Sequence, residues 1–167
     1  FRSGIVGYNT GDTSIRGNIC NCYSEVKINS GIIVGGIAGY IFYTDIIRCY
    51  NVGDIDVIST SGIEVGGIVG YASGNVINCY NQGNISASGN ATGNYATPCA
   101  GGIVGYSMDR ALRNCYNNGT VICNNTRVSY AGGIIGYAIR TKVNNSYNTG
   151  NVSSISGNDN AYVGKIS

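Results

Sequence analysis

Histidine and tryptophan are absent from the 167 residues, and proline and methionine occur once each. Without histidine the chain cannot form a His-Glu-x-x-His zinc site, a catalytic triad that uses imidazole, or a histidine-ligated zinc centre. We therefore predict that the chain is not an enzyme, and we expect no catalytic residues, no cofactor and no metal site.

Charge is also scarce. Charged residues make up 11% of the chain and the formal net charge is +2, which provides no basic surface for phosphates, so nucleic acid is not expected as a partner. No apolar run approaches the roughly 20 residues that cross a bilayer, and the N-terminus lacks the regions of a signal peptide. We expect no membrane insertion in this fragment.

The chain is rich in residues of strands and turns, with 27 glycines and 14 tyrosines. A block of two glycines, two apolar residues, a glycine and a tyrosine recurs at nearly constant spacing, which is typical of tandem repeats. Four full copies occupy residues 35–40, 66–71, 101–106 and 132–137, and a variant begins at Ser3.

Two further motifs follow each block at constant phase. The first is Cys-Tyr-Asn, found at 49–51, 79–81 and 115–117, as Ser-Tyr-Asn at 146–148, and as Cys-Tyr-Ser at 22–24. The second is Gly-x-(Ile/Val), which begins at Gly53, Gly83, Gly119 and Gly150. Each unit is therefore expected to contain three short strands separated by Gly, Asn and Ser turns.

Successive blocks begin at residues 3, 35, 66, 101, 132 and 164, so one unit is about 31 residues long. We treat the chain as a single tandem-repeat domain with units at 3–34, 35–65, 66–100, 101–131 and 132–163 and the start of a sixth at 164–167. Extra residues fall between Tyr8 and Cys22 and at 88–99, positions expected for surface loops. Because the sequence opens and closes within a unit, we expect a fragment of a larger protein.

A unit of three short strands cannot bury its own apolar face, whereas units stacked in register pair each strand with its equivalent. We predict an all-β fold, a right-handed parallel β-solenoid of about five to six coils with three short strands in each. A propeller-like arrangement is the alternative. Strict alternation in residues 76–80 cannot place both Val76 and Cys79 inside, so we expect a bend or bulge there.

Parallel stacking places equivalent side chains about 4.8 Å apart in ladders. Interior isoleucines, stacked tyrosines and amides that bond to one another are the expected ladders. The isoleucine ladder is Ile5, Ile37, Ile68, Ile103 and Ile134. The tyrosine ladder is Tyr8, Tyr40, Tyr71, Tyr106 and Tyr137, and the asparagine ladder is Asn51, Asn81, Asn117 and Asn148.

Four of the seven cysteines share one repeat position, at which the fifth unit has Ser146. A small, weakly polar side chain suits that position, so we predict a ladder of free thiols that lines the core. Its members are Cys22, Cys49, Cys79 and Cys115. Cys99 and Cys123 lie off this ladder and are the best disulfide candidates, since one bridge would close the long insertion against the adjacent coil.

The block Gly-Gly-Ile-Val-Gly-Tyr at 66–71 and 101–106, and Asn-Cys-Tyr-Asn-x-Gly-Asn-Ile at 78–85, resemble the GLUG repeat of large bacterial surface proteins. That family includes adhesin-like proteins and the non-catalytic regions of immunoglobulin A zinc peptidases. The resemblance covers nearly the whole chain and implies an extracellular, cell-surface or cell-wall setting and a repeat role without a reaction. The sequence departs from the pattern at Ser3, Ser24, Glu25 and Ser146.

Charged residues leave two alternatives open. Asp54 and Asp56, at i and i+2, could bind calcium or act on a sugar, but Asn, Ser, Thr and Ile replace them in other units, which favours a polar outward face. A basic excess in the C-terminal half could meet an acidic glycan or protein, although a solvated face is favoured. It comprises Arg110, Arg113, Arg127, Arg140 and Lys142.

The leading hypothesis is a structural or adhesive repeat scaffold of a bacterial cell-surface protein, which spaces domains and presents loops, above all 88–99. The first alternative is a dedicated module that binds a glycan or host protein through the tyrosines and that insertion. The second is a β-helical polysaccharide-active enzyme. The expected partners are a glycan or an extracellular protein, and unpaired strand edges at the solenoid ends would allow end-to-end self-association.

Overall fold

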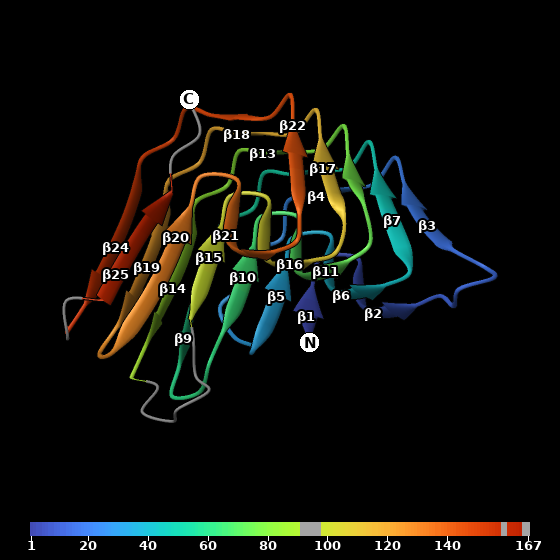
Figure 1. Cartoon of the computed structure of the whole chain (residues 1–167). Coiled ribbons are helices and arrows are strands. Elements are labelled where there is room, and N and C mark those ends of the chain that lie inside the picture. The colour runs from blue at the N-terminus through green and yellow to red at the C-terminus, as the bar shows by residue number, and fades with distance from the viewer. Residues whose placement is uncertain (91–97, 158–159, 165–167) are drawn as a thin grey trace.

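The computed structural model describes residues 1–90, 98–157 and 160–164, and every regular element within them is a β-strand. Strands one unit apart in sequence lie side by side, and all of their pairings are parallel (Figure 1). The predictions of an all-β fold and of a parallel β-solenoid are confirmed. Its right-handed sense stays a prediction.

A full coil visits five sheets, which we call A to E in the order in which the chain enters them. Sheet A comprises β1 (Arg2–Ser3), β5 (Ile33–Gly35), β10 (Glu64–Gly66), β15 (Cys99–Gly101), β20 (Val128–Gly132) and β25 (Asn160–Gly164). Sheet B comprises β2 (Val6–Thr10), β6 (Ala38–Phe42), β11 (Val69–Ser73), β16 (Val104–Met108) and β21 (Ile135–Ile139). Sheet C comprises β3 (Gly17–Cys20), β7 (Thr44–Ile47), β12 (Val76–Ile77), β17 (Ala111–Arg113) and β22 (Lys142–Asn144). Sheet D comprises β4 (Tyr23–Ser24), β8 (Tyr50–Asn51), β13 (Tyr80–Asn81), β18 (Tyr116–Asn117) and β23 (Tyr147–Asn148). Sheet E comprises β9 (Ile55–Ser59), β14 (Ile85–Gly89), β19 (Val121–Asn125) and β24 (Val152–Ser156).

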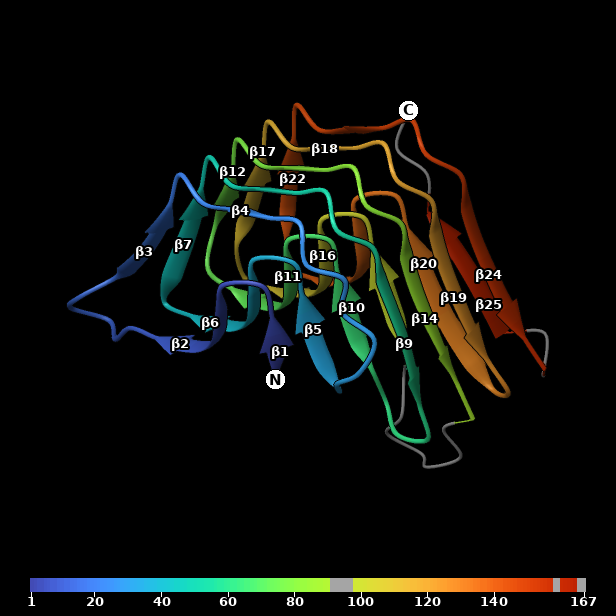
Figure 2. The ribbon, with the colours of Figure 1, turned by 180° about the vertical axis from the view of Figure 1, so that it is seen from behind.

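The expectation of three strands in each coil was wrong, because the chain turns more often than the motifs indicate. Sheet A is formed by the residues that lead into the first glycine of the Gly-Gly block, and sheet C by residues that precede the Cys-Tyr-Asn motif. Figure 2 shows the same stack from behind, with β9, β14, β19 and β24 side by side at one end of the coil.

A left-handed residue separates sheet C from sheet D in every coil. The five residues at this corner have φ between 47° and 56°. They are Asn21, Arg48, Asn78, Asn114 and Asn145. Asparagine tolerates this conformation better than most residues. The turn interrupts the side-chain alternation, so Val76 and Cys79 are both buried, and the expected bend is confirmed at Asn78.

A second corner, between sheets B and C, varies from coil to coil. The second, fourth and fifth coils each have an extra left-handed residue there. These residues are Tyr43, Asp109 and Arg140, with φ of 49°, 59° and 48°. The third coil lacks this residue: Ser73 pairs with Phe42 and Val76 with Ile46, which leaves one residue fewer between the two sheets. The chain consequently runs so close to the coil before it that a Cβ on Gly74 would lie 1.6 Å from the carbonyl oxygen of Thr44.

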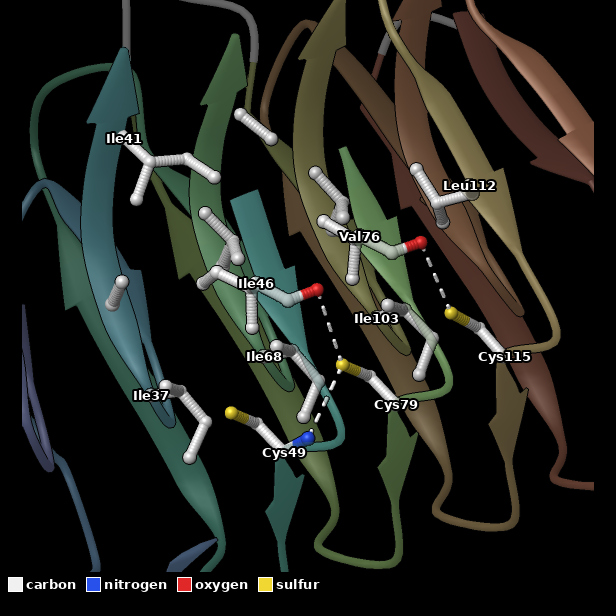
Figure 3. Packing of buried hydrophobic residues seen from close by; sticks show 14 of the residues in the cluster. Ile37, Ile41, Ile46, Cys49, Ile68, Val76, Cys79, Ile103, Leu112 and Cys115 are labelled. Atoms are coloured by element: carbon white, nitrogen blue, oxygen red, sulfur yellow. Dashed lines mark hydrogen bonds between the residues drawn. The ribbon is translucent and has the colours of Figure 1, made fainter. Parts of the chain in front are cut away.

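The interior is divided into two apolar clusters. One lies between sheets B, C and D and contains Ile37, Ile68 and Ile103 (Figure 3). The other lies between sheets A and E and contains Val34 and Val65. The Gly-Gly turn between sheets A and B meets the inner side of sheet D at the boundary, and a Cβ on Gly67 would lie 2.4 Å from Cγ of Asn81 and 2.2 Å from the carbonyl oxygen of Gly102. Only glycine fits this approach.

Both expected insertions lie in connections between strands. In the first coil residues 11–16 join β2 to β3, where the second coil has Tyr43 alone. In the third coil residues 90–98 join β14 to β15, and the second coil has residues 60–63 at this place. Residues 91–97 of the insertion, and residues 165–167 of the expected sixth unit, lie outside the described residues.

Ile5 departs from the predicted interior ladder. Its neighbour Val6 pairs with Ala38, so Ile5 has the register of Ile37, but its side chain is 47% exposed whereas Ile37 is fully buried. Within the described chain no coil lies on its other side, so one side of the residue stays uncovered.

No described segment forms a helix long and apolar enough to cross a membrane.

Candidate binding surfaces

The asparagine ladder lies on the inner side of sheet D, and its four side chains are buried. Nδ2 of Asn51 donates to Oδ1 of Asn81 at 2.8 Å and to the carbonyl oxygen of Gly53 at 2.7 Å. Asn81 and Asn117 repeat both bonds at 2.7 Å. In the first coil Ser24 takes this position, and Oδ1 of Asn51 has no partner among the described residues. The ladder is a buried structural network.

The ladder cysteines line the cluster between sheets B, C and D. Cys49, Cys79 and Cys115 are buried, and Cys22 is partly buried. The backbone N–H of Cys49 donates to Sγ of Cys79 at 3.4 Å, and Sγ of Cys79 donates to the carbonyl oxygen of Ile46 at 3.8 Å (Figure 3). Cys115 repeats the second contact with Val76 at 3.5 Å. These thiols fill space within the interior and hold weak hydrogen bonds to the neighbouring coil.

Cys99 and Cys123, the candidate disulfide, are free thiols in the structure. Cys123 lies in the cluster between sheets A and E with Ala100, whereas Cys99, the neighbour of Ala100 in β15, is not a member of that cluster. Alternation along the strand therefore turns Cys99 away from Cys123, which explains why the bridge is not formed. Burial raises the pKa of Cys123 to about 12 and the pKa of Cys99 well above its usual value.

Tyrosines form two ladders rather than the single one expected. In sheet B the ring centroids of the predicted ladder are separated by 4.7 to 5.4 Å. In sheet D a second ladder covers the outer side with the same spacings, and its members are Tyr23, Tyr50, Tyr80, Tyr116 and Tyr147. Adjacent rings in the middle of this second ladder are nearly parallel, at 2° and 3°. Their faces are covered by one another, so a sugar ring meets only edges and hydroxyl groups there.

Glu64 is the single acidic residue of sheet A and lies close to the sheet B tyrosines. Its Oε2 is buried without a hydrogen-bond partner among the described residues. Burial raises the pKa of this carboxyl to about 7. Burial, the neighbouring Tyr40 and Tyr106, and Glu64 raise the pKa of Tyr71 to about 12. The paired strands carry Ile33 and Cys99 at the position of Glu64, so the repeat itself does not signal this residue.

The acidic pair of the sequence lies near and on sheet E. Asp56 is exposed and shares its row with Ser86, while Asp54 accepts a hydrogen bond from the backbone N–H of Asn84 at 2.9 Å. Three or more His, Cys, Asp or Glu side chains arranged to hold a metal ion are not found within residues 1–90, 98–157 and 160–164. Asp56 lies on the outer face of this sheet, where Ile58 and Ile155 are also exposed.

Two of the shallow hollows on the described surface lie beside residues singled out from the sequence. One, of about 400 Å³, lies at the end of sheet E beside the described ends of the insertion and is lined by Ile58, Ser88, Asn124 and Ile155 among others. The other, of about 270 Å³, lies at the corner between sheets B and C. The second hollow is lined by Arg16, Asn75, Asp109, Arg110, Ala111, Arg140 and Lys142. Of the five basic residues considered from the sequence, the structure brings Arg110, Arg140 and Lys142 together here.

Sheets A to E and the ladders that cross them define the chain as a tandem-repeat β-solenoid. Residues 61–86 and 96–122 match the family model described as the GLUG motif. These segments contain the Gly-Gly blocks and Cys-Tyr-Asn motifs of the third and fourth coils, so the expected resemblance is confirmed for this part of the chain. Comparisons with curated proteins and with solved structures give no significant match.

Proposed function

We propose that this repeat array is a non-enzymatic scaffold of a bacterial cell-surface protein, which holds neighbouring domains apart and presents its outer faces and loops for contact. The observation that carries the proposal is the unbroken register of the ladders. In consecutive coils each ladder asparagine bonds to the equivalent asparagine of the next coil, and each sheet D tyrosine stacks on the equivalent tyrosine. A stack of this kind lengthens by one coil, about 4.8 Å, for each unit added.

The GLUG motif match supports the repeat role, and the resemblance to bacterial surface proteins supports the extracellular location. Length variation also fits a scaffold. It is largest in two connections, residues 11–16 and 90–98, while the strands on either side keep their register. Changes in such loops alter what the scaffold presents and leave its core unchanged.

A pair of variants tests the scaffold role. Deletion of residues 36–66 joins Gly35 to Gly67 and removes one coil in register, because Gly35 pairs with Gly66. Duplication of the same residues adds a coil. We expect small-angle scattering to show the dimension along the stack fall and rise by about 4.8 Å. A folded duplication product whose length does not change contradicts the proposal.

The location has its own test in the cell that makes the parent protein. Antibodies raised against this chain are expected to label intact cells. Labelling that requires permeabilised cells would exclude the cell surface, whatever the scattering result.

A dedicated binding module is the second candidate, and the hollow at the end of sheet E favours it, because its wall includes Ser88, Gly89 and Asn90 at the start of the insertion. The second coil offers a matched control loop. Replacement of residues 90–98 by the sequence of residues 60–63 shortens the connection and keeps the flanking pairs Gly89–Ser59 and Cys99–Glu64. Saturable binding to an array of glycans and matrix proteins that this variant loses supports the module; binding unchanged by it, or none, contradicts it.

A further inference from the structure

Four cationic side chains and one carboxylate line the hollow between sheets B and C. The carboxylate, Asp109, forms an ion pair with Arg140, whose Nη2 donates to Oδ2 at 2.9 Å. Arg16, at the opposite end, pairs with Asp45 at 2.5 Å. Asp45 is not part of the lining. Burial raises its pKa, but the hydrogen bonds from Arg16 and Asn75 outweigh burial and leave the pKa below its usual value.

Two cations of the hollow have no carboxylate partner among the described residues. Arg110 donates through Nε to the carbonyl oxygen of Ser73 at 3.3 Å and through Nη1 to that of Asp109 at 3.1 Å, and its guanidinium lies 5.4 Å from the ring centre of Tyr43. These contacts hold the guanidinium in place without an ion pair to a carboxylate. Lys142 is exposed, and no hydrogen bond or ion pair of its ammonium group is found in the described chain.

The depth of the hollow follows from the register of sheet C. The outer row of this sheet runs Asp45, Asn75, Ala111, Lys142. Asn75 and Ala111 of the two middle coils form the floor, and the long side chains of Arg16 and Lys142 line its two ends. At the same corner the third coil has one residue fewer, beside Gly74, and runs close to the second coil. The depression therefore extends along the stack, across several coils.

We propose that this hollow binds an acidic polysaccharide, with the carboxylate or sulfate groups of successive sugars on Arg110 and Lys142. An elongated polar depression suits a linear, hydrated chain of sugars, and fixed guanidinium and mobile ammonium groups both bind oxyanions. A folded protein partner would need an apolar pocket in which to bury its anchoring side chains, and this lining of charged and polar residues provides none. A nucleic acid would need more positive charge than a net +2 over the whole chain.

The test measures binding of the full chain to polygalacturonate, which carries carboxylates, and to dextran sulfate, with neutral dextran as the reference polymer. Binding to at least one acidic polymer, weakened by salt, is the expected result. We expect Lys142→Glu to weaken it about tenfold and Lys142→Arg to leave it nearly unchanged. Preference between the two polymers tells whether carboxylate or sulfate is the better ligand group.

Lys27→Glu is the matched control, since Lys27 is also exposed and lies beyond sheet D, away from the hollow. Equal losses in Lys27→Glu and Lys142→Glu would mean that binding follows overall charge, and would overturn the site. Poly-glutamate that binds as tightly as the sugars would overturn the polysaccharide assignment. Absence of binding to both acidic polymers overturns the inference itself, while the scattering test of the scaffold stands unaffected.

Discussion

The two sides of sheet D carry ladders of the same period and opposite character. On the inner side Asn81 is fully buried and bonded to the asparagines of both adjacent coils. On the outer side its neighbour Tyr80 stacks on Tyr50 and Tyr116 at 4.7 and 4.9 Å and faces solvent. Repetition of a residue thus does not by itself show its role. Buried amides must each find a partner, whereas exposed rings gain a little from each neighbour.

The largest expected effect concerns the approach of the Gly-Gly turn to the inner ladder. We expect Gly67→Ala to destabilise the fold by about 4 kcal/mol, because the new Cβ would meet a rigid backbone oxygen and the side chain of Asn81. Chemical denaturation measures the loss. Gly7→Ala is the control, since a Cβ at Gly7 meets nothing within 4 Å. Equal effects of the two changes would show that the close approach is not important.

The inner ladder itself comes next. Asn81→Ala removes an acceptor from Asn51, a donor from Asn117 and a donor from the carbonyl oxygen of Gly83. We expect a loss of about 3 kcal/mol in the free energy of unfolding, because buried polar groups then lack partners. Gln82→Ala, at the exposed next residue, should change the stability little. A loss as small as that of Gln82→Ala would remove the distinction between the two sides.

Glu64 is a buried polar residue that belongs to no ladder, so its titration shows what burial costs without ladder hydrogen bonds. Because its pKa is raised to about 7, the folded state holds the proton more tightly than the unfolded chain. The stability that this proton contributes is complete below about pH 4.5 and is lost as the pH rises through about 7, by about 3 kcal/mol. Glu64→Gln should remove this loss and be the more stable protein at pH 8, whereas Glu25→Gln, at an exposed site, should not. Parallel pH profiles of wild type and Glu64→Gln would contradict the expectation.

The outer ladder should matter less. We expect Tyr80→Ser to cost about 1 kcal/mol, because it removes two stacking contacts at a surface. Tyr80→Phe keeps the ring and should restore the melting temperature nearly to that of the wild type. A cost as large as that of Asn81→Ala would show that the outer ladder also determines the register.

The smallest expected effect is an increase in the stability of the fold. Ser24→Asn places an amide beside Asn51, whose Oδ1 has no partner in the described residues. The new amide could donate to that oxygen and extend the ladder by one coil, with an expected stabilisation of about 0.5 kcal/mol. Ser24→Ala serves as the control and should give no gain. A destabilised Ser24→Asn protein would indicate that the first coil has no room for the amide.

The period, the parallel pairing and the asparagine ladder could be predicted because each rests on a residue that recurs at one phase, such as Asn51. The number of strands could not be predicted, since sheet C has no constant residue, sheet A has only the glycine that ends most of its strands, and the corner at Asn78 is a backbone conformation. The position of Ile5 followed the repeat correctly, but its exposure depends on a neighbouring coil. The hollow beside Lys142 arises from differences between coils, and a repeat pattern shows only what the coils share.

The hydrogen bonds of the asparagine ladder all run the same way. The amides of Asn51, Asn81 and Asn117 each donate to the asparagine of the following coil, and Asn81, Asn117 and Asn148 each accept from the coil before. The small dipoles of these amides therefore add along the solenoid axis, and the two directions along the stack are chemically different. The ladder ends in an acceptor, Oδ1 of Asn51, on the side of the first coil, and in the amide nitrogen of Asn148 on the side of the fifth. Growth of such an array is vectorial: a new coil joins in one polarity, and a reversed coil would set two like groups against each other.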